Sequence, residues 1–281
     1  MEKHKKKIPI GIDRFKHLRE EDFYYVDKTG FIREFLHSWG EVNLFTRPRR
    51  FGKSLNLDMF QTFFEIGADA SYFDGLEIVK DQMLCEKYMG KFPVVSLTLK
   101  DAEGLDYREA IENMGYLISR EARRMQHLLD SDKLTDIEKS MLKQLCSPEM
   151  DAKTQRNSLA LLSELLYKQY NQKVILLIDE YDVPLDKAYQ HGYYKQMVLH
   201  IRSLFSSALK TNKFLYAAVI TGCLRIAKES IFTGLNNFSV DAITDTRFAQ
   251  YFGFTDDEVR ELLAYYELDE FYASVKEWYD G

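Results

Sequence analysis

Short runs of almost entirely apolar residues recur along this chain, and stretches with helical spacing separate them. Polar or turn-forming residues bound each run. Strands buried on both faces have this composition, and their alternation with helices is typical of a parallel sheet covered on both sides. The pattern therefore predicts an α/β fold with a five-stranded, mainly parallel sheet. The predicted strands are residues 42–46, 94–99, 174–178, 214–220 and 239–243.

A long helical segment interrupts this alternation between the second and third predicted strands. Tyr107, Ile111, Met114 and Ile118 repeat at the spacing of one helical face. Two further stretches of helical period follow, near 134–145 and 157–170. We expect residues from about 100 to 172 to form a helical insertion in the sheet domain.

The character of the chain changes after residue 245. Thr255 and Glu258 have the Thr-x-x-Glu spacing of a capping box, which predicts the start of a helix, and a second helix is expected over 270–279. We therefore expect an α/β domain over residues 1–245 and a small acidic helical unit over 246–281. That unit is expected to be the start of a lid or accessory domain, cut short at Gly281.

Composition places the chain among globular proteins, with 281 residues, 46% hydrophobic and 29% charged. The net charge of −6 is unevenly distributed: residues 241–281 hold eleven acidic and three basic residues, a net of −8, so residues 1–240 carry +2. A surface devoted entirely to nucleic acid is excluded by this balance. We expect any contact with DNA to be indirect.

Cysteine spacing and hydropathy argue against four further classes of protein. The three cysteines have no C-x-x-C spacing, which argues against a disulfide framework and a zinc site. The longest apolar runs, 174–178 and 214–220, are far shorter than the ~20 residues of a membrane span. The basic N-terminus lacks the apolar core of a signal peptide. We expect a cytoplasmic protein with no membrane contact.

A phosphate-binding loop is predicted between the first strand and the helix that follows it. Gly52, Lys53 and Ser54 form the end of the pattern G-x-x-x-x-G-K-[ST], although Arg47 replaces its first glycine. In such a loop the backbone N–H groups and the lysine bind phosphates, and the serine hydroxyl ligates Mg²⁺. The expected nucleotide-binding residues are Arg49, Arg50, Phe51, Gly52, Lys53, Ser54 and Leu55.

Two strand ends supply the other expected groups of this site. The apolar run 174–178 ends in Asp179 and Glu180, which places Asp179 at the carboxyl edge of the sheet, where open α/β folds bind ligands. We expect Asp179 and Ser54 to bind Mg²⁺, and Glu180 to activate the attacking water. Thr221 follows the run 214–220 and is expected beside the γ-phosphate. Arg225 is a candidate for a phosphate of the same or a neighbouring subunit.

Each of these motifs also has a purely structural interpretation. A tripeptide of the pattern G-K-[ST] arises by chance in about one in ten chains of this length, and a strand can simply end in polar residues. Arg225 could form a surface ion pair. The arginines of residues 47–50 could neutralise a triphosphate or form a basic patch for DNA or an acidic partner. The loop and the acidic strand end support each other, because one site needs both.

These segments resemble the bacterial predicted AAA-ATPase-like family. The resemblance rests on residues 24–29, 47–54, 177–184, 221–237 and 278–281, and it spans nearly the whole chain. It implies a P-loop fold with sheet order 5-1-4-3-2, and a family loop that reads R-P-R-R-F-G-K-[ST], so Arg47 is typical of it. The family's chains usually continue into a nuclease-like domain, which would be a partner beyond Gly281. The motif Asp151-Ala-Lys153 lies in a polar loop and is not expected to be a nuclease centre.

The sequence therefore predicts an ATP-binding domain in which Mg²⁺-dependent hydrolysis drives or gates a conformational switch. A different class also fits: a nucleotide-gated scaffold that binds ATP with little or no hydrolysis and regulates a DNA-acting domain. A kinase is a weaker alternative, since no residues for a phosphoryl acceptor are evident. The guanine-reading pattern N-K-x-D is absent, which favours ATP over GTP. Oligomers are compatible with either function.

Overall fold

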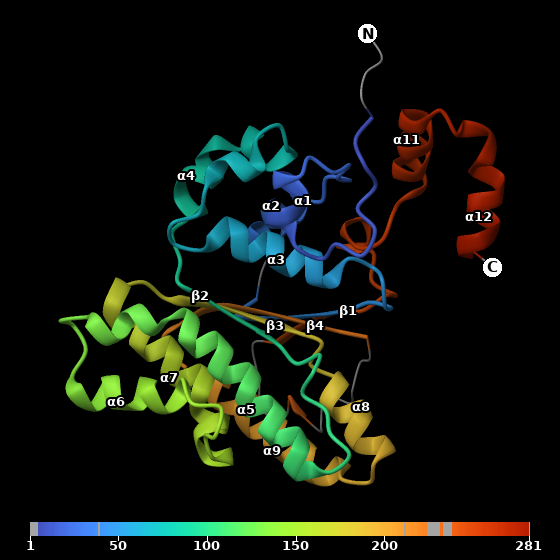
Figure 1. The fold of residues 1–281 in the computed structure, drawn as a ribbon. Coiled ribbons are helices and arrows are strands. Elements are labelled where there is room, and N and C mark those ends of the chain that lie inside the picture. Colours follow the sequence, from blue (N-terminus) through green and yellow to red (C-terminus); the bar gives the residue numbers. More distant parts are fainter. Residues whose placement is uncertain (1–4, 39, 211, 224–230, 233–237, 281) are drawn as a thin grey trace.

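A five-stranded, entirely parallel sheet forms the centre of the computed structural model, which describes residues 5–38, 40–210, 212–223, 231–232 and 238–280 (Figure 1). The strand order is β2-β3-β4-β1-β5, the expected order 5-1-4-3-2 read from the other edge. All four strand pairs are parallel. The strands are β1 Val42–Thr46, β2 Val94–Thr98, β3 Val174–Asp179, β4 Leu215–Gly222 and β5 Phe238–Asp241.

Helices cover both faces of the sheet, as Figure 1 shows. Successive strand residues point to opposite faces, so Leu176 and Ile178 lie in one hydrophobic core, and Ile175 and Leu177 lie in the other. The first face is covered by α5 Tyr107–Arg124, α6 Asp136–Leu145, α7 Ala152–Tyr170, α8 Val183–Gln190 and α9 Tyr194–Phe205. The second is covered by α1 Phe15–Glu20, α2 Gly30–Ser38, α3 Lys53–Phe64 and α4 Gln82–Tyr88. The α/β prediction is confirmed.

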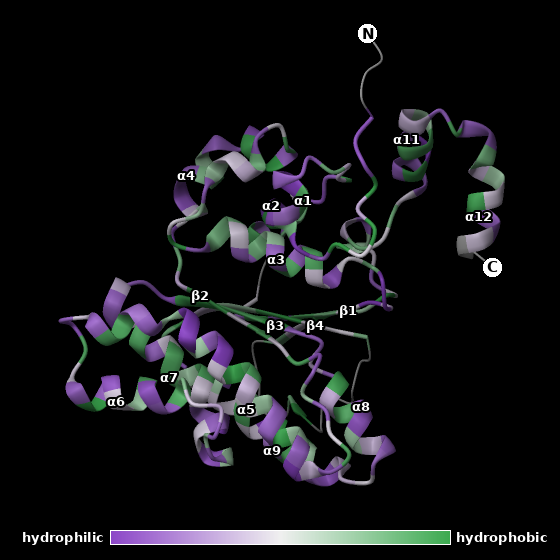
Figure 2. Ribbon diagram, viewed as in Figure 1, coloured by the Kyte–Doolittle hydropathy of each residue, from purple (hydrophilic) through white to green (hydrophobic). Residues whose placement is uncertain are grey.

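The helical insertion consists of α5, α6 and α7, in agreement with the three predicted stretches. Each helix begins at a residue whose side chain accepts a backbone hydrogen bond from its first turn: Asp106, Thr135 and Asp151 respectively. The longest of these helices, α7, carries both apolar and polar residues, and Figure 2 shows a similar mixture along its neighbours. Within the part of the chain that the structure describes, we find no helix with the length and apolar character needed to cross a membrane.

Aromatic side chains fill the core on the side of α3. The ring of Phe31 stacks on Tyr251 at a centroid distance of 5.2 Å and meets Phe45 edge to face at the same distance. Phe60, from the middle of α3, lies 4.8 Å from the Phe31 ring. These large buried rings hold α3 against the sheet, so the loop before α3 starts from a rigid base.

The C-terminal residues begin within this same core. Phe248, Tyr251 and Phe252 are buried among the rings of α2, α3 and β1. The helices α11 Asp256–Tyr266 and α12 Tyr272–Asp280 follow, and α11 has the predicted capping box between Thr255 and Glu258. The division into units at residues 245 and 246 remains a prediction.

An ion pair between the buried Glu121 and the partly exposed Arg124 covers the free edge of β2. Glu121 Oε1 accepts a 2.7 Å hydrogen bond from the backbone N of Ser96, and Arg124 Nη2 donates a 2.6 Å bond to the carbonyl oxygen of Val94. Glu121 and Arg124 also bind each other at 2.8 Å. These two side chains from α5 satisfy backbone groups that an edge strand would otherwise present to another chain.

Replacing Glu121 with Ala should lower the free energy of unfolding by about 2 kcal/mol, because the Ser96 amide loses its buried acceptor, whereas Arg124 keeps its ion pair with Glu65. Urea denaturation monitored by circular dichroism measures this change. Glu112→Ala on the same helix is the matched control, since its pair with Arg108 is exposed and should contribute less than about 1 kcal/mol. Equal losses in the two variants would contradict the assigned role of Glu121.

Candidate functional site

The loop between β1 and α3 turns through two residues in the left-handed backbone region. Arg50 has φ of 70° and Gly52, the residue before α3, has φ of 75°. The chain therefore makes its turn at these positions and does not need a glycine at Arg47. The N-cap residue of α3, Gly52, makes no side-chain hydrogen bond to the first turn of the helix, which begins at Lys53. Open N–H groups at a helix N-terminus are suited to an anion.

Lys53 is folded back onto the loop. Its Nζ donates to the carbonyl oxygens of Arg47 at 3.0 Å and Pro48 at 2.8 Å, and it lies 3.4 Å from Cys223 Sγ. The side chain is only 5% exposed. The ammonium is held by neutral acceptors, which an anionic oxygen would outcompete because charge-assisted hydrogen bonds are stronger.

Asp179 joins the loop helix to two neighbouring strands. Its Oδ2 accepts a 2.5 Å hydrogen bond from Ser54 Oγ, at the start of α3, and its Oδ1 accepts one from Thr221 Oγ1, at the end of β4. Because β4 lies between β1 and β3, Thr221 reaches the acidic strand end directly. The structure thus brings together Ser54, Asp179 and Thr221, which the sequence places 125 and 42 residues apart.

The oxygens of Ser54 and Asp179 suit a hard cation such as Mg²⁺. Among the described residues, no group of three or more His, Cys, Asp or Glu side chains could hold a metal ion. Ser54 and Asp179 together offer a hydroxyl and a carboxylate, which suit an ion that takes its other ligands from phosphate and water, as Mg²⁺ does in phosphoryl-transfer sites.

Glu180 follows Asp179 in a strained conformation, with φ of 53°. Strain of this kind persists where the surroundings impose it, often at functional sites. Burial raises the pKa of the Glu180 carboxyl, and the charge of Asp179 adds to this effect, whereas Lys100 and Lys53 oppose it. A half-buried carboxylate with a raised pKa is a stronger base than an exposed one. Lys100 is a neighbour of Glu180 that the sequence analysis did not identify. Its one signal in the sequence is its position directly after the predicted strand 94–99.

Gly222 allows β4 to end in close contact with the segment after Glu180. A Cβ atom at Gly222 would lie 2.5 Å from the ring of Tyr181 and 2.7 Å from Asp182 Oδ1. Asp182 Oδ2 also accepts a 2.9 Å hydrogen bond from the backbone N of Cys223. These contacts hold Thr221 beside Asp179. The predicted site residue Arg225 lies outside the described residues.

Arg47 has a structural partner, which separates it from the other loop arginines. Its guanidinium forms a buried ion pair with Asp241 at the end of β5, and it lies over the Phe252 ring at 4.7 Å. Arg47 is 3% exposed. Burial raises the pKa of Asp241, and the positive charge of Arg47 opposes that rise. Arg49 and Arg50 are exposed, so they are the arginines of this loop that a phosphate could reach.

The segment from Gln250 to Gly253 contacts the loop and the start of α3. The backbone N of Gly253 donates to the carbonyl oxygen of Phe51 at 3.1 Å, and Asn56 Nδ2 donates to that of Tyr251 at 2.8 Å. A Cβ atom at Gly253 would lie 3.1 Å from the Phe51 ring. Leu55 packs on the aromatic core. Phe51 and Leu55 thus have structural contacts, and their expected role toward a nucleotide remains a prediction.

A buried lysine connects this segment to α11. Lys28 Nζ donates to the carbonyl oxygen of Gln250 at 2.6 Å and to the carboxylate of Glu258 at 2.5 Å. Glu258 also accepts a hydrogen bond from the backbone N of Thr255 in the capping box of α11. Lys28, from the N-terminal part of the chain, and Glu258, from the C-terminal part, therefore contact each other next to the segment that packs on the loop before α3.

Comparisons with known proteins identify a family and a distant relative of this chain. The family model described as predicted AAA-ATPase matches residues 9–232. A protein from Azotobacter chroococcum mcd 1, described as an uncharacterized protein in the vnfD 5′ region, is 29% identical over 291 residues. That alignment covers 99% of this chain and 48% of the relative, so the chain spans about half of the relative's length. No solved structure matches the chain.

The Arg47–Asp241 ion pair should show strong coupling in a double-mutant cycle. Asp241→Ala or Arg47→Ala alone should lower the free energy of unfolding by about 3 kcal/mol, since each leaves a buried charge without its partner. The double variant should recover about 2 kcal/mol of the summed loss, measured by guanidinium denaturation. Additive losses would show that the two charges do not stabilise each other.

Proposed function

Because this chain belongs to the predicted AAA-ATPase family, we propose that it binds ATP with Mg²⁺ at the carboxyl edge of its sheet and hydrolyses it. The observation that carries the proposal is the hydrogen-bonded set of Ser54, Asp179 and Thr221 next to the start of α3. A phosphate-binding helix terminus, a carboxylate for the metal and a hydroxyl at the neighbouring strand end are the parts that phosphoryl transfer requires.

The triphosphate would bind to the N–H groups of the loop and of the first turn of α3. Lys53 would exchange the carbonyl oxygens of Arg47 and Pro48 for anionic phosphate oxygens, with a gain in hydrogen-bond strength. Arg49 and Arg50, which are exposed, would add positive charge at the rim. The positive end of the α3 dipole favours the same anion.

Ser54 and Asp179 would hold Mg²⁺, which supplies Lewis-acid stabilisation of the charge that develops on the phosphate oxygens. Glu180 would accept a proton from the attacking water, a role that its raised pKa supports. Thr221 would orient that water from the end of β4. Arg225 stays in the proposal as a residue that contacts the γ-phosphate or that of a neighbouring subunit.

A nucleotide-gated module with little turnover is the second candidate. It is favoured by the closed arrangement of the site, in which Lys53 is bonded to its own loop and both Asp179 oxygens are occupied by Ser54 and Thr221. In this version, nucleotide binding would rearrange the loop and gate a partner domain, with DNA contacted only through that domain. The three free cysteines support a reducing compartment such as the cytoplasm.

Lys53→Ala should weaken ATP binding by about 100-fold, because the charged hydrogen bonds to phosphate are lost. Isothermal titration calorimetry with Mg·ATP measures the change. Lys91→Ala, at an exposed lysine before β2, is the matched control and should bind like the parent chain. Unchanged affinity in Lys53→Ala would refute the assignment of the loop.

Glu180→Gln should retain ATP affinity and lower turnover by about 100-fold or more, since the amide cannot accept the proton. A steady-state phosphate-release assay with Mg²⁺ separates the two candidate functions. Glu86→Gln, at an exposed position of α4, should leave the rate unchanged. If the parent chain binds ATP and releases no phosphate, the gating module replaces the hydrolase; equal rates in parent and Glu180→Gln exclude Glu180 as the base.

A further inference from the structure

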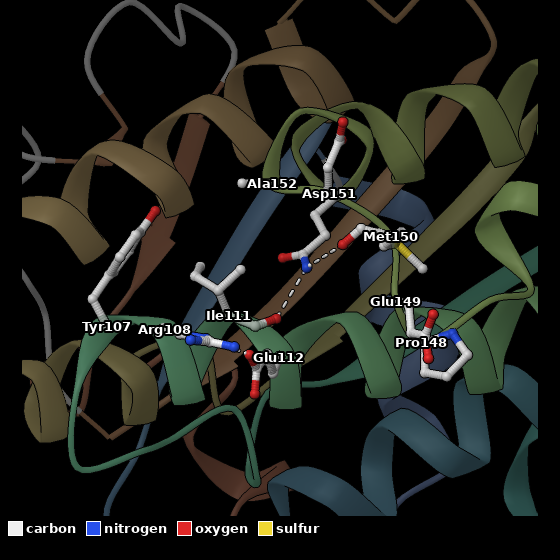
Figure 3. Close-up of a pocket in the computed structure, with 10 residues that line it drawn as sticks. Tyr107, Arg108, Ile111, Glu112, Pro148, Glu149, Met150, Asp151 and Ala152 are labelled. Atoms are coloured by element: carbon white, nitrogen blue, oxygen red, sulfur yellow. Dashed lines mark hydrogen bonds and ion pairs between the residues drawn. The ribbon is translucent and has the colours of Figure 1, made fainter.

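A cavity of about 620 Å³, open to solvent, lies at the surface of the helical insertion and is lined by α5 and the start of α7. Figure 3 shows Tyr107 and Ile111 on one side, and Met150 and Ala152 on the other. None of the predicted nucleotide-binding residues lines it. Its volume lies within the range of small-molecule sites, and these four side chains give it apolar walls.

A buried hydrogen-bond acceptor lies at this cavity. Gln155 is 1% exposed, and its Nε2 donates to the carbonyl oxygens of Ile111 at 3.0 Å and Met150 at 3.3 Å, the two dashed lines of Figure 3. Gln155 Oε1 has no hydrogen-bond partner among the described residues. Gly115 makes room for this amide, since a Cβ atom there would lie 2.9 Å from Nε2. A buried acceptor without a partner lowers the stability of a fold by about 1–3 kcal/mol. A ligand that donates a hydrogen bond to this oxygen would remove that penalty.

The rim of the cavity is negatively charged. Glu112, Glu149 and Asp151 are exposed carboxylates on its lining, against the single positive charge of Arg108, which is paired with Glu112 at 2.9 Å. Asp151 accepts a hydrogen bond from the backbone N of Thr154 and remains exposed. The lining residues have a net charge of −2, from Glu112, Glu149 and Asp151 against Arg108. Lys153 acts on Asp151 and Arg156 acts on Tyr107 from α7. The net negative charge of the lining favours a cation over a phosphate.

We propose that this cavity is a second ligand site, which takes an aromatic ring carrying an N–H or O–H donor and a positively charged amine on a short stem. The donor satisfies Gln155 Oε1. The ring packs against Ile111, Tyr107 and the thioether of Met150, a contact that sulfur and aromatic rings favour. The ammonium group interacts with the rim carboxylates. A free arylalkylamine and adjacent aromatic and basic side chains of a peptide both have this chemistry.

Calorimetric titration with matched probes tests each part of this chemistry. Tryptamine and tyramine should bind, whereas phenethylamine, which lacks the ring donor, should bind about tenfold more weakly. Indole-3-propionate reverses the charge and should not bind. The peptide Lys-Trp-Lys, with capped ends, distinguishes the sources: tighter binding than tryptamine indicates a polypeptide ligand, and weaker binding indicates a free amine. Absence of binding by all the amines, or equal binding of indole-3-propionate, overturns the proposal.

Two variants test whether tryptamine binds in this cavity, and both keep Gln155 itself unchanged. Ile111→Trp fills the cavity and should abolish tryptamine binding, and Glu149→Lys should weaken it by about tenfold through loss of one favourable charge and gain of an opposing one. Glu86→Lys makes the same charge change at an exposed position of α4 and should have no effect. Thermal unfolding of each variant checks that it folds. Binding that persists in a folded Ile111→Trp variant overturns the proposal.

Discussion

The carboxylate of Asp179 connects the parts of the sheet edge that the proposed chemistry needs. It accepts hydrogen bonds from Ser54 on the loop helix and from Thr221 on β4, while the strand that carries it is buried on both faces. The two hydroxyls thus have a defined distance from each other before any ligand arrives. Such preorganisation lowers the entropy that binding must overcome. The apolar strand β3 supplies the rigidity, and its last residue supplies the chemistry.

The loop achieves its shape without the glycine that phosphate-binding loops commonly have at their first position. Arg47 is extended into the interior, where Asp241 neutralises it and Phe252 covers its guanidinium. Left-handed conformations occur later, at Arg50 and Gly52. A left-handed conformation at Arg50 costs about 1–2 kcal/mol, which the surrounding packing must offset. The arginines of this loop therefore have different roles: Arg47 stabilises the fold, and Arg49 and Arg50 place positive charge at the surface.

Features with a local cause could be predicted from the sequence. The strand ending at Asp179 is an uninterrupted apolar run, and the capping box at Thr255 and Glu258 spans four residues, so both were predicted from short windows. The start of α3 at Lys53 followed from the spacing of Gly52, Lys53 and Ser54. In contrast, the pairing of Arg47 with Asp241 joins residues 194 positions apart, and no local pattern encodes it. The contacts of Lys53 with carbonyl oxygens likewise depend on the folded loop.

The same long separation has a consequence for biosynthesis. Ribosomes add about 5–20 residues per second, so the 194 residues between Arg47 and Asp241 take roughly 10–40 seconds to synthesise. During that interval the arginine stays hydrated, and the loop lacks Phe252 and Gly253 as neighbours. The loop to which we assign phosphate binding is thus synthesised early, and its neighbours Asp241, Phe252 and Gly253 are synthesised late. A phosphate-bearing metabolite that binds the loop during synthesis would meet a more open conformation than that of the finished domain.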